Sequence, residues 1–246
     1  MFFSNISQIL NKDKKMTIGE MTSMLNTKNI KIPHNGHSFA AYVQGDKDTI
    51  YGDYLVGSSV NPTKIRDYCF YRSPITSIGI RIDLYASIGV SAFEGCENVH
   101  EFYLSYSGTT GGNVKTLKEI GDRAFFGVGS KTKMSINFDL IEGSKLERIG
   151  VSAFEGMGGD KGSPSVMYVG GYNNNNPLSR IESRAFANSN LRYFVLGYVS
   201  DYIAPDIFAS CTNLETVRVI FPQSSSAATN FPWGADTKIT KFVWQG

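Results

Sequence analysis

One short pattern recurs along most of this chain and constrains its fold more than any other feature. Close copies of Ile88-Gly-Val-Ser-Ala-Phe93 return with an isoleucine five residues before a phenylalanine. The isoleucines of the six copies are Ile65, Ile88, Ile120, Ile149, Ile181 and Ile203. They are separated by 23, 32, 29, 32 and 22 residues, so a unit of about 22 to 23 residues recurs, three times with an insertion. A period in this range is typical of a solenoid, in which each unit buries its apolar face only against its neighbours.

A second apolar group follows each copy at a fixed spacing. After Ile203 it consists of Leu214, Val217 and Val219, and the last two are two residues apart. That spacing is the period of a β-strand with one buried face. The same spacing occurs at Val99, Phe102 and Leu104, at Leu191, Phe194 and Leu196, and at Ile75, Ile78 and Ile80. Each unit is therefore predicted to pair an Ile-to-Phe turn, formed as a short helix or 3₁₀ segment, with a short parallel strand.

Segments outside the repeat define three parts of the chain. Residues 1–60 lack the pattern and are predicted to attach the protein to a partner and to cap the first coil. Residues 61–222 form the six-unit solenoid, and residues 223–246 add a capping strand, with Trp233 and Trp244 covering the open end of the core. Gly-, Ser- and Asn-rich insertions at 107–118, 127–133 and 157–177 are predicted as surface loops.

The full pattern, Ile-Gly-x-x-Ala-Phe-x-x-Cys-x-x-Leu-x-x-Val-x-Leu, resembles the BspA-type (Treponema-type) leucine-rich repeat over residues 64–220. The resemblance implies a leucine-rich-repeat stack, and this family is mostly known for surface adhesins. The terminal Pro232-Trp-Gly-Ala before a final strand is similar to the end of leucine-rich-repeat proteins among bacteriophage virion and prophage products.

The composition of the chain argues against several classes of function. The 24 basic and 22 acidic residues are interleaved and leave a net charge of +2, so nucleic-acid binding is not expected. The first residues lack the charged and apolar regions of a secretory signal, and no apolar stretch reaches 18 residues, so membrane insertion is not expected. The cysteines Cys69, Cys96 and Cys211 are predicted as buried core residues rather than disulfide partners.

No catalytic or metal-binding pattern is found. His34 and His37 lack companions at zinc spacing, and Asp46, Asp48 and Asp53 lack the spacing of a calcium loop. We therefore expect no enzyme activity, no cofactor and no metal.

The remaining candidates are surface residues, because aromatic and arginine side chains commonly anchor interfaces. Outward positions of the strands and two tyrosine-bearing loops give the candidate interaction surface: Tyr103, Tyr193, Val195, Thr216, Arg218, Tyr172 and Tyr198. The alternative is that these are ordinary outward residues of a parallel sheet.

The sequence favours a non-enzymatic recognition or assembly module. Our first expectation is a structural protein of the phage particle, attached to a protein partner through its N-terminal segment and exposing the repeat for contact with a host-surface protein or glycan. The absence of a secretion signal led to this choice. The alternative is a bacterial cell-surface or secreted adhesin that binds host proteins or glycans.

Overall fold

A computed structural model describes residues 49–51, 63–65, 67–68, 70–72, 77–81, 85–105, 117–140, 145–158, 166–171 and 178–245. The structural statements below concern this part of the chain. Nearly all of the predicted attachment segment, residues 1–60, lies outside it. The three described residues of that segment form a strand, Thr49–Tyr51, at one end of the larger sheet.

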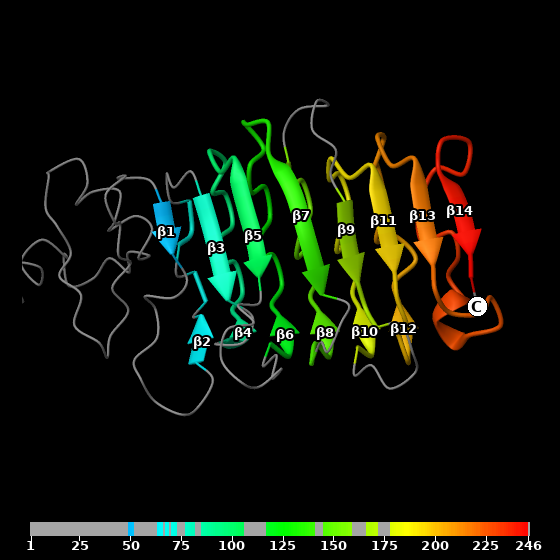
Figure 1. The fold of residues 1–246 in the computed structure, drawn as a ribbon. Coiled ribbons are helices and arrows are strands. Elements are labelled where there is room, and N and C mark those ends of the chain that lie inside the picture. The colour runs from blue at the N-terminus through cyan, green and yellow to red at the C-terminus, as the bar shows by residue number, and fades with distance from the viewer. Residues whose placement is uncertain are drawn as a thin grey trace, which may run out of the picture.

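The described chain winds into a solenoid with two parallel sheets (Figure 1). The larger sheet has eight strands in the spatial order β1 (Thr49–Tyr51), β3 (Ser77–Arg81), β5 (Glu101–Ser105), β7 (Ser135–Leu140), β9 (Val166–Val169), β11 (Tyr193–Leu196), β13 (Thr216–Val219) and β14 (Lys241–Trp244). The smaller sheet has six strands, β2 (Thr63–Ile65), β4 (Tyr85–Ile88), β6 (Glu119–Ile120), β8 (Arg148–Ile149), β10 (Arg180–Ile181) and β12 (Tyr202–Ile203). The prediction of a repeat solenoid is confirmed.

The isoleucines of the repeat form one continuous ladder. Each ends a strand of the smaller sheet and pairs in register with the isoleucine of the next coil, from Ile65 through to Ile203. All six side chains are buried. The sequence pattern did not indicate this second sheet, because strands of two to four residues are too short to show an alternation of apolar and polar positions.

The turn between isoleucine and phenylalanine differs from the short helix that we expected. Its backbone is left-handed three residues after the isoleucine, at Ser91, Arg123, Ser152 and Arg184, and again seven residues after it, at Gly95, Gly127, Gly156 and Asn188. A left-handed residue interrupts the right-handed dihedral angles that a helix needs. Among the described residues, the only helix is the 3₁₀ segment η2 (Ser226–Ala228).

Hydrogen bonds give the physical reason for this turn. Its N–H groups alternate between a carbonyl in the same turn and a carbonyl in the next coil. Ala92 donates to Gly89 O at 3.3 Å, whereas Phe93 donates to Ala124 O at 2.7 Å. Half of the backbone donors are thus used between coils and cannot close helical turns. Each turn is therefore stabilised by its neighbour as well as by its own sequence.

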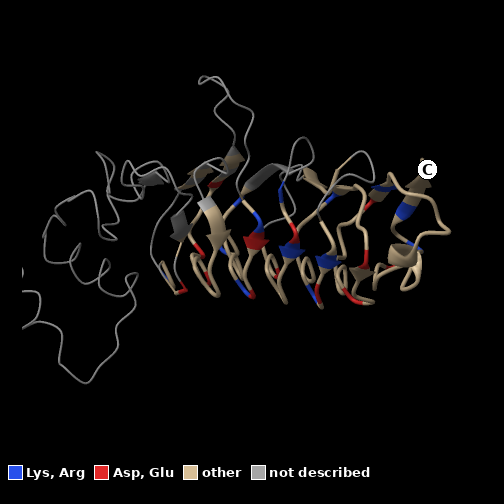
Figure 2. Cartoon of the chain, turned by 90° about the horizontal axis from the view of Figure 1, so that it is seen from below, with Lys and Arg blue, Asp and Glu red and all other residues tan. Residues whose placement is uncertain are grey.

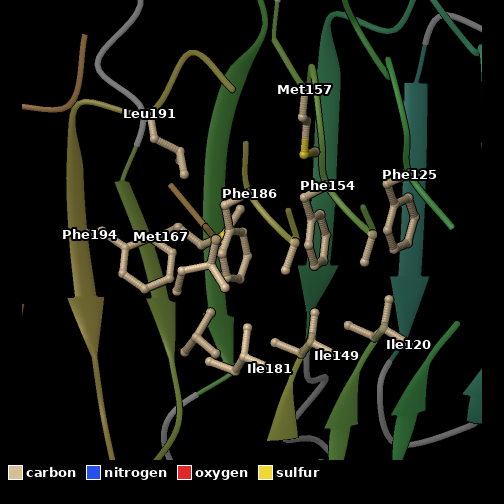
Figure 3. Packing of buried hydrophobic residues seen from close by; sticks show 14 of the residues in the cluster. Ile120, Phe125, Ile149, Phe154, Met157, Met167, Ile181, Phe186, Leu191 and Phe194 are labelled. Carbon is tan, nitrogen blue, oxygen red and sulfur yellow. The ribbon is translucent and has the colours of Figure 1, made fainter. Parts of the chain in front are cut away.

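The core is built from layers of repeated side chains (Figure 3). The phenylalanine rings are stacked through the array, with centroid distances of 4.9 Å for Phe70–Phe93, 5.3 Å for Phe93–Phe125, 5.2 Å for Phe125–Phe154, 5.5 Å for Phe154–Phe186 and 6.0 Å for Phe186–Phe208. The alanine before each well-matched phenylalanine is also buried, which agrees with the expected shortage of space there. Cys96 and Cys211 are buried free thiols, as predicted, while Cys69 lies outside the described residues.

Two of the predicted insertion loops contain parts of the repeat. Residues 157–177 include strand β9, whose Met167 and Val169 are buried, and residues 127–133 include the buried Val128. These side chains occupy the same layers as residues of the other coils, because β9 pairs in register with both β7 and β11. The prediction of pure surface loops was wrong at these positions. A methionine in place of the usual leucine or valine hid the strand.

An aromatic cluster closes the C-terminal end of the core. Trp233 is fully buried and donates a hydrogen bond from Nε1 to Ala227 O at 3.2 Å. Phe221, Phe231, Phe242 and Trp244 surround it, with ring centroids 5.4 to 6.2 Å from that of Trp233. Trp233 thus covers the last coil, as expected, and Trp244 packs against it from β14.

Candidate functional site

The outward face of the larger sheet carries side chains in two rows. Strand register aligns Val166, Tyr193, Thr216 and Lys241 in the first row. It aligns Tyr168, Val195, Arg218 and Val243 in the second row. We call these eight residues the outer face. Hydrogen-bonded strands are about 4.8 Å apart. A single ligand can therefore contact neighbouring side chains of one row at the same time.

The structure brings four predicted residues together on this face. Tyr193 and Thr216 are half-buried and Arg218 is exposed. Val195, which we expected to be exposed, is only 3% accessible. It lies in register between the larger side chains of Tyr168 and Arg218, which flank it. Val195 therefore supports its neighbours and offers little surface of its own.

Of the other three predicted residues, one lies in the first row on a more distant strand, one lies beyond the end of β11, and one lies outside the described residues. Tyr198 is half-buried beyond the end of β11, where Gly171 and Tyr198 form an isolated antiparallel bridge, and its ring lies 6.5 Å from that of Phe221. Tyr103 lies in β5 and shares the first row through its pairing with Asn137 in β7. Tyr172 lies outside the described residues.

The sequence analysis did not place four members on the outer face: Val166, Tyr168, Lys241 and Val243. Val166 and Tyr168 were assigned to an insertion, and the last two belong to the strand that was assigned only a capping role. Aligning 166–169 and 241–244 with the other strands would have revealed them, because 166–169 alternates in burial like β13 and 241–244 pairs in register with it.

The outer face has a positive character near its C-terminal end. Arg192 at its margin is paired with Glu215, Nε to Oε1 at 2.8 Å. Arg218 instead donates from Nε to the neutral amide oxygen of Gln245 at 2.6 Å, and Lys241 is exposed. Within the described residues, neither Arg218 nor Lys241 has a carboxylate partner within 4.0 Å. The outer face thus carries two cationic groups that have no carboxylate partner in the described part of the chain.

The smaller sheet presents a different surface, because its charges pair with one another (Figure 2). Arg148 in β8 contacts Glu119 at 3.0 Å, Asp122 at 2.7 Å and Glu182 at 3.6 Å. Arg180 in β10 contacts Glu182 at 3.0 Å and Asp201 at 3.1 Å. This network uses its ionic groups internally, so it is a weaker candidate for binding a charged ligand than the outer face.

The turns carry a further pair of charge contacts between coils. Glu94 accepts two hydrogen bonds from Arg123, and Glu155 accepts them from Arg184. Burial alone would raise the pKa of both carboxyl groups, but the hydrogen bonds from these arginines and from Ser91 and Ser152 outweigh burial and lower each pKa below its usual value. Both glutamates are therefore ionised structural groups, which is the opposite of what a general acid requires.

Among the described residues, no group of three or more His, Cys, Asp or Glu side chains is arranged to hold a metal ion. The same part of the chain contains no helix long and apolar enough to cross a bilayer. Cys211 is a buried thiol whose pKa is raised by burial, so it is not an activated nucleophile.

The two in-register sheets, the isoleucine ladder and the stacked phenylalanines define a leucine-rich-repeat solenoid. Residues 63–159 and 171–242 match the family described as "BspA type Leucine rich repeat region", in six copies. The chain belongs to this family. The match extends beyond residue 222 and takes in the C-terminal turn and the first two residues of β14.

The chain is also similar to one solved structure, that of a leucine rich cell surface protein from Faecalibacterium prausnitzii A2-165. It is 18% identical, with a TM-score of 0.39, and the alignment covers 77% of this chain and 47% of that one. This chain therefore spans about half the length of that protein. No curated protein matches the sequence. Neither comparison connects the chain with a phage particle, so the virion prediction gains no support.

Proposed function

We propose that this protein is a non-enzymatic recognition module at a bacterial cell surface, and that its outer face binds a protein partner. Membership of the BspA-type repeat family favours this alternative over the virion, because surface adhesion is the role that the resemblance implies. The observation that carries the proposal is the in-register grouping of Tyr168, Tyr193 and Arg218 on one rigid sheet.

The chemistry of the outer face suits a protein surface. Tyrosine and arginine are enriched at the centre of protein interfaces, and tyrosine buries a large area with little loss of conformational freedom. Val195 is buried in register between Tyr168 and Arg218, and Arg218 donates a hydrogen bond from Nε to Gln245 Oε1, so Arg218 is partly held in place before a partner arrives. Such preorganisation lowers the entropic cost of binding.

A binding assay with matched variants tests this proposal. The purified protein is presented to a panel of extracellular-matrix and serum proteins, with a glycan array in parallel. We expect at least one protein ligand, and we expect Tyr193→Ala combined with Arg218→Ala to weaken its binding by about a hundredfold or more. Lys118→Ala, on the opposite side of the solenoid and in an exposed ion pair with Glu147, is the matched control.

Several outcomes would contradict the proposal. Binding that Tyr193→Ala and Arg218→Ala leave unchanged would place the site elsewhere, and binding to glycans alone would change the class of ligand. Turnover of a substrate by the purified protein would overturn the non-enzymatic assignment.

The proposed location is tested separately by antibody labelling of intact source cells and of any phage particles that these cells release. We expect label on the intact cells. Label confined to particles would restore the virion prediction, and label found only after the cells are broken open would contradict both locations.

A further inference from the structure

Among the described residues, strand β14 ends the larger sheet with an open edge. It pairs with β13 on one side only (Figure 1). Lys241 N–H and Gln245 N–H donate to Glu215 O at 2.8 Å and to Val219 O at 2.9 Å, both on the β13 side. The peptide groups of successive residues in a strand point to opposite sides, so the N–H and C=O groups of Phe242 and Trp244 point to the open edge. An exposed edge of this kind is a template for pairing with another strand.

Apolar side chains surround this edge. Phe242 and Trp244 are only half-buried, and the ring of Phe231 lies 4.8 Å from that of Phe242 and 5.5 Å from that of Trp244. Phe231 is 36% exposed and Ile239 is 49% exposed, and they are two of the four large apolar residues that remain exposed in the described chain. The free hydrogen-bonding groups and the exposed apolar groups thus occur at the same end of the solenoid.

We propose that this edge is the interface between two copies of the chain, which pair antiparallel through β14 about a two-fold axis at Val243. In this register Phe242 of each copy lies opposite Trp244 of the other copy. The two residues of each such pair exchange backbone hydrogen bonds. The larger sheets of the two copies become one continuous sheet. The proposal is independent of the ligand-binding role of the outer face.

Charge and hydrogen bonding select this register. It places Lys241 opposite the neutral Gln245 of the second copy, so no two lysines face each other across the strands, where like charges destabilise pairing. Moving the axis to Phe242 would set Trp244 opposite Thr240, whose N–H already donates to Asp236 O at 2.8 Å. With the axis at Val243, the N–H and C=O groups of Phe242 and Trp244 therefore pair between the copies and do not compete with hydrogen bonds within the chain.

A second copy of the chain also suits the open edge of β14 better than a strand from another protein. A two-fold contact of this edge with itself pairs the β14 edge of each copy and leaves neither of these two edges open, so the assembly closes at two copies. It also places the half-buried aromatic rings of both copies next to one another, and aromatic pairs across strands stabilise such contacts.

Charge variants at the axis test the proposal with the whole chain of 246 residues. Light scattering coupled to size exclusion should give twice the 27.1 kDa chain mass for the unaltered protein at tens of micromolar. Val243→Lys and Val243→Glu each place like charges opposite one another, and each should raise the dimer dissociation constant roughly tenfold or more. Mixing the two variants places opposite charges at the axis and should restore the dimer.

Tyr193→Lys adds the same charge to the same face two strands away from the edge and should leave the dimer unchanged. Thermal unfolding of each Val243 variant shows whether the monomer remains folded, and the recovery on mixing is itself a test of folding. The proposal is overturned if the unaltered chain remains a monomer, if Val243→Lys leaves a dimer intact, or if the mixture of the two variants does not associate.

Discussion

Arg184 and Glu155 form a two-point ion pair that joins adjacent coils, with Nη2–Oε1 at 2.6 Å and Nε–Oε2 at 3.1 Å. The pair of Arg123 with Glu94 repeats the same arrangement 61 residues earlier. Ion pairing between turns thus recurs at every second coil. In each pair the glutamate is the more buried member, with a side-chain exposure of 11% for Glu155 against 39% for Arg184.

Replacing Arg184 with alanine should lower the free energy of unfolding by about 2 kcal/mol, because it leaves a mostly buried carboxylate without its main donor. Urea denaturation measures the change. Lys118→Ala removes one partner of an exposed pair with Glu147 and should cost less than about 0.5 kcal/mol. Equal effects of the two substitutions would show that burial of Glu155 adds nothing to the strength of the contact.

Stability should fall in acid because of the same glutamates. Glu94 and Glu155 have pKa values below the ordinary 4.5 in the folded protein. Their stabilising contribution is therefore complete above pH 4.5 and is lost as the pH falls through the lower, folded-state pKa. Urea denaturation at a series of pH values should show this decline. Glu155→Gln should flatten the curve below pH 4.5, and a curve of unchanged slope would contradict the assignment.

The glycine after the repeat isoleucine should resist substitution where coils approach closely. A Cβ atom at Gly150 would lie 2.5 Å from Asp122 N and 2.7 Å from Gly121 C, both backbone atoms of the preceding coil. Gly150→Ala should therefore cost about 3 kcal/mol, since the coils must separate to admit the methyl group.

Gly127→Ala is the matched control for Gly150→Ala. Gly127 has a φ of +67° but no atom within 4 Å of a Cβ position, so its substitution should cost only about 1 kcal/mol of backbone strain. Denaturation curves of both variants measure the difference. A larger cost at Gly127 would mean that backbone conformation, not space between coils, limits these positions.

Trp233→Ala should open the C-terminal end of the array. The side chain is fully buried over the last coil, so its loss should cost about 3 to 5 kcal/mol. Because a solenoid unfolds from its weakest interface, hydrogen exchange should accelerate first in β13 and β14. Trp244→Ala removes a half-exposed ring from the same cluster and should cost less than half as much. Uniform acceleration of exchange through all coils would contradict this local role.

The sequence by itself determined the solenoid and the composition of its core. Ile120, Phe125 and the apolar residues of each strand meet the same neighbours in every coil, so their recurrence reports the packing directly. The buried state of Trp233 and of two cysteines followed from the same argument. These features depend on local periodicity, which a single chain displays in its spacing.

Contacts between coils, which only the tertiary structure shows, decided the smaller sheet, the form of the turns and the burial of Val195. The smaller sheet exists because two-residue segments of successive coils lie in register, and the turns are not helical because their N–H groups are shared with the next coil. Val195 is buried although its strand position predicts exposure, since Tyr168 and Arg218 flank it from neighbouring strands. Strand alternation specifies which side of a sheet a residue occupies, but the side chains beside it in the stack depend on register, and register is a property of the tertiary structure.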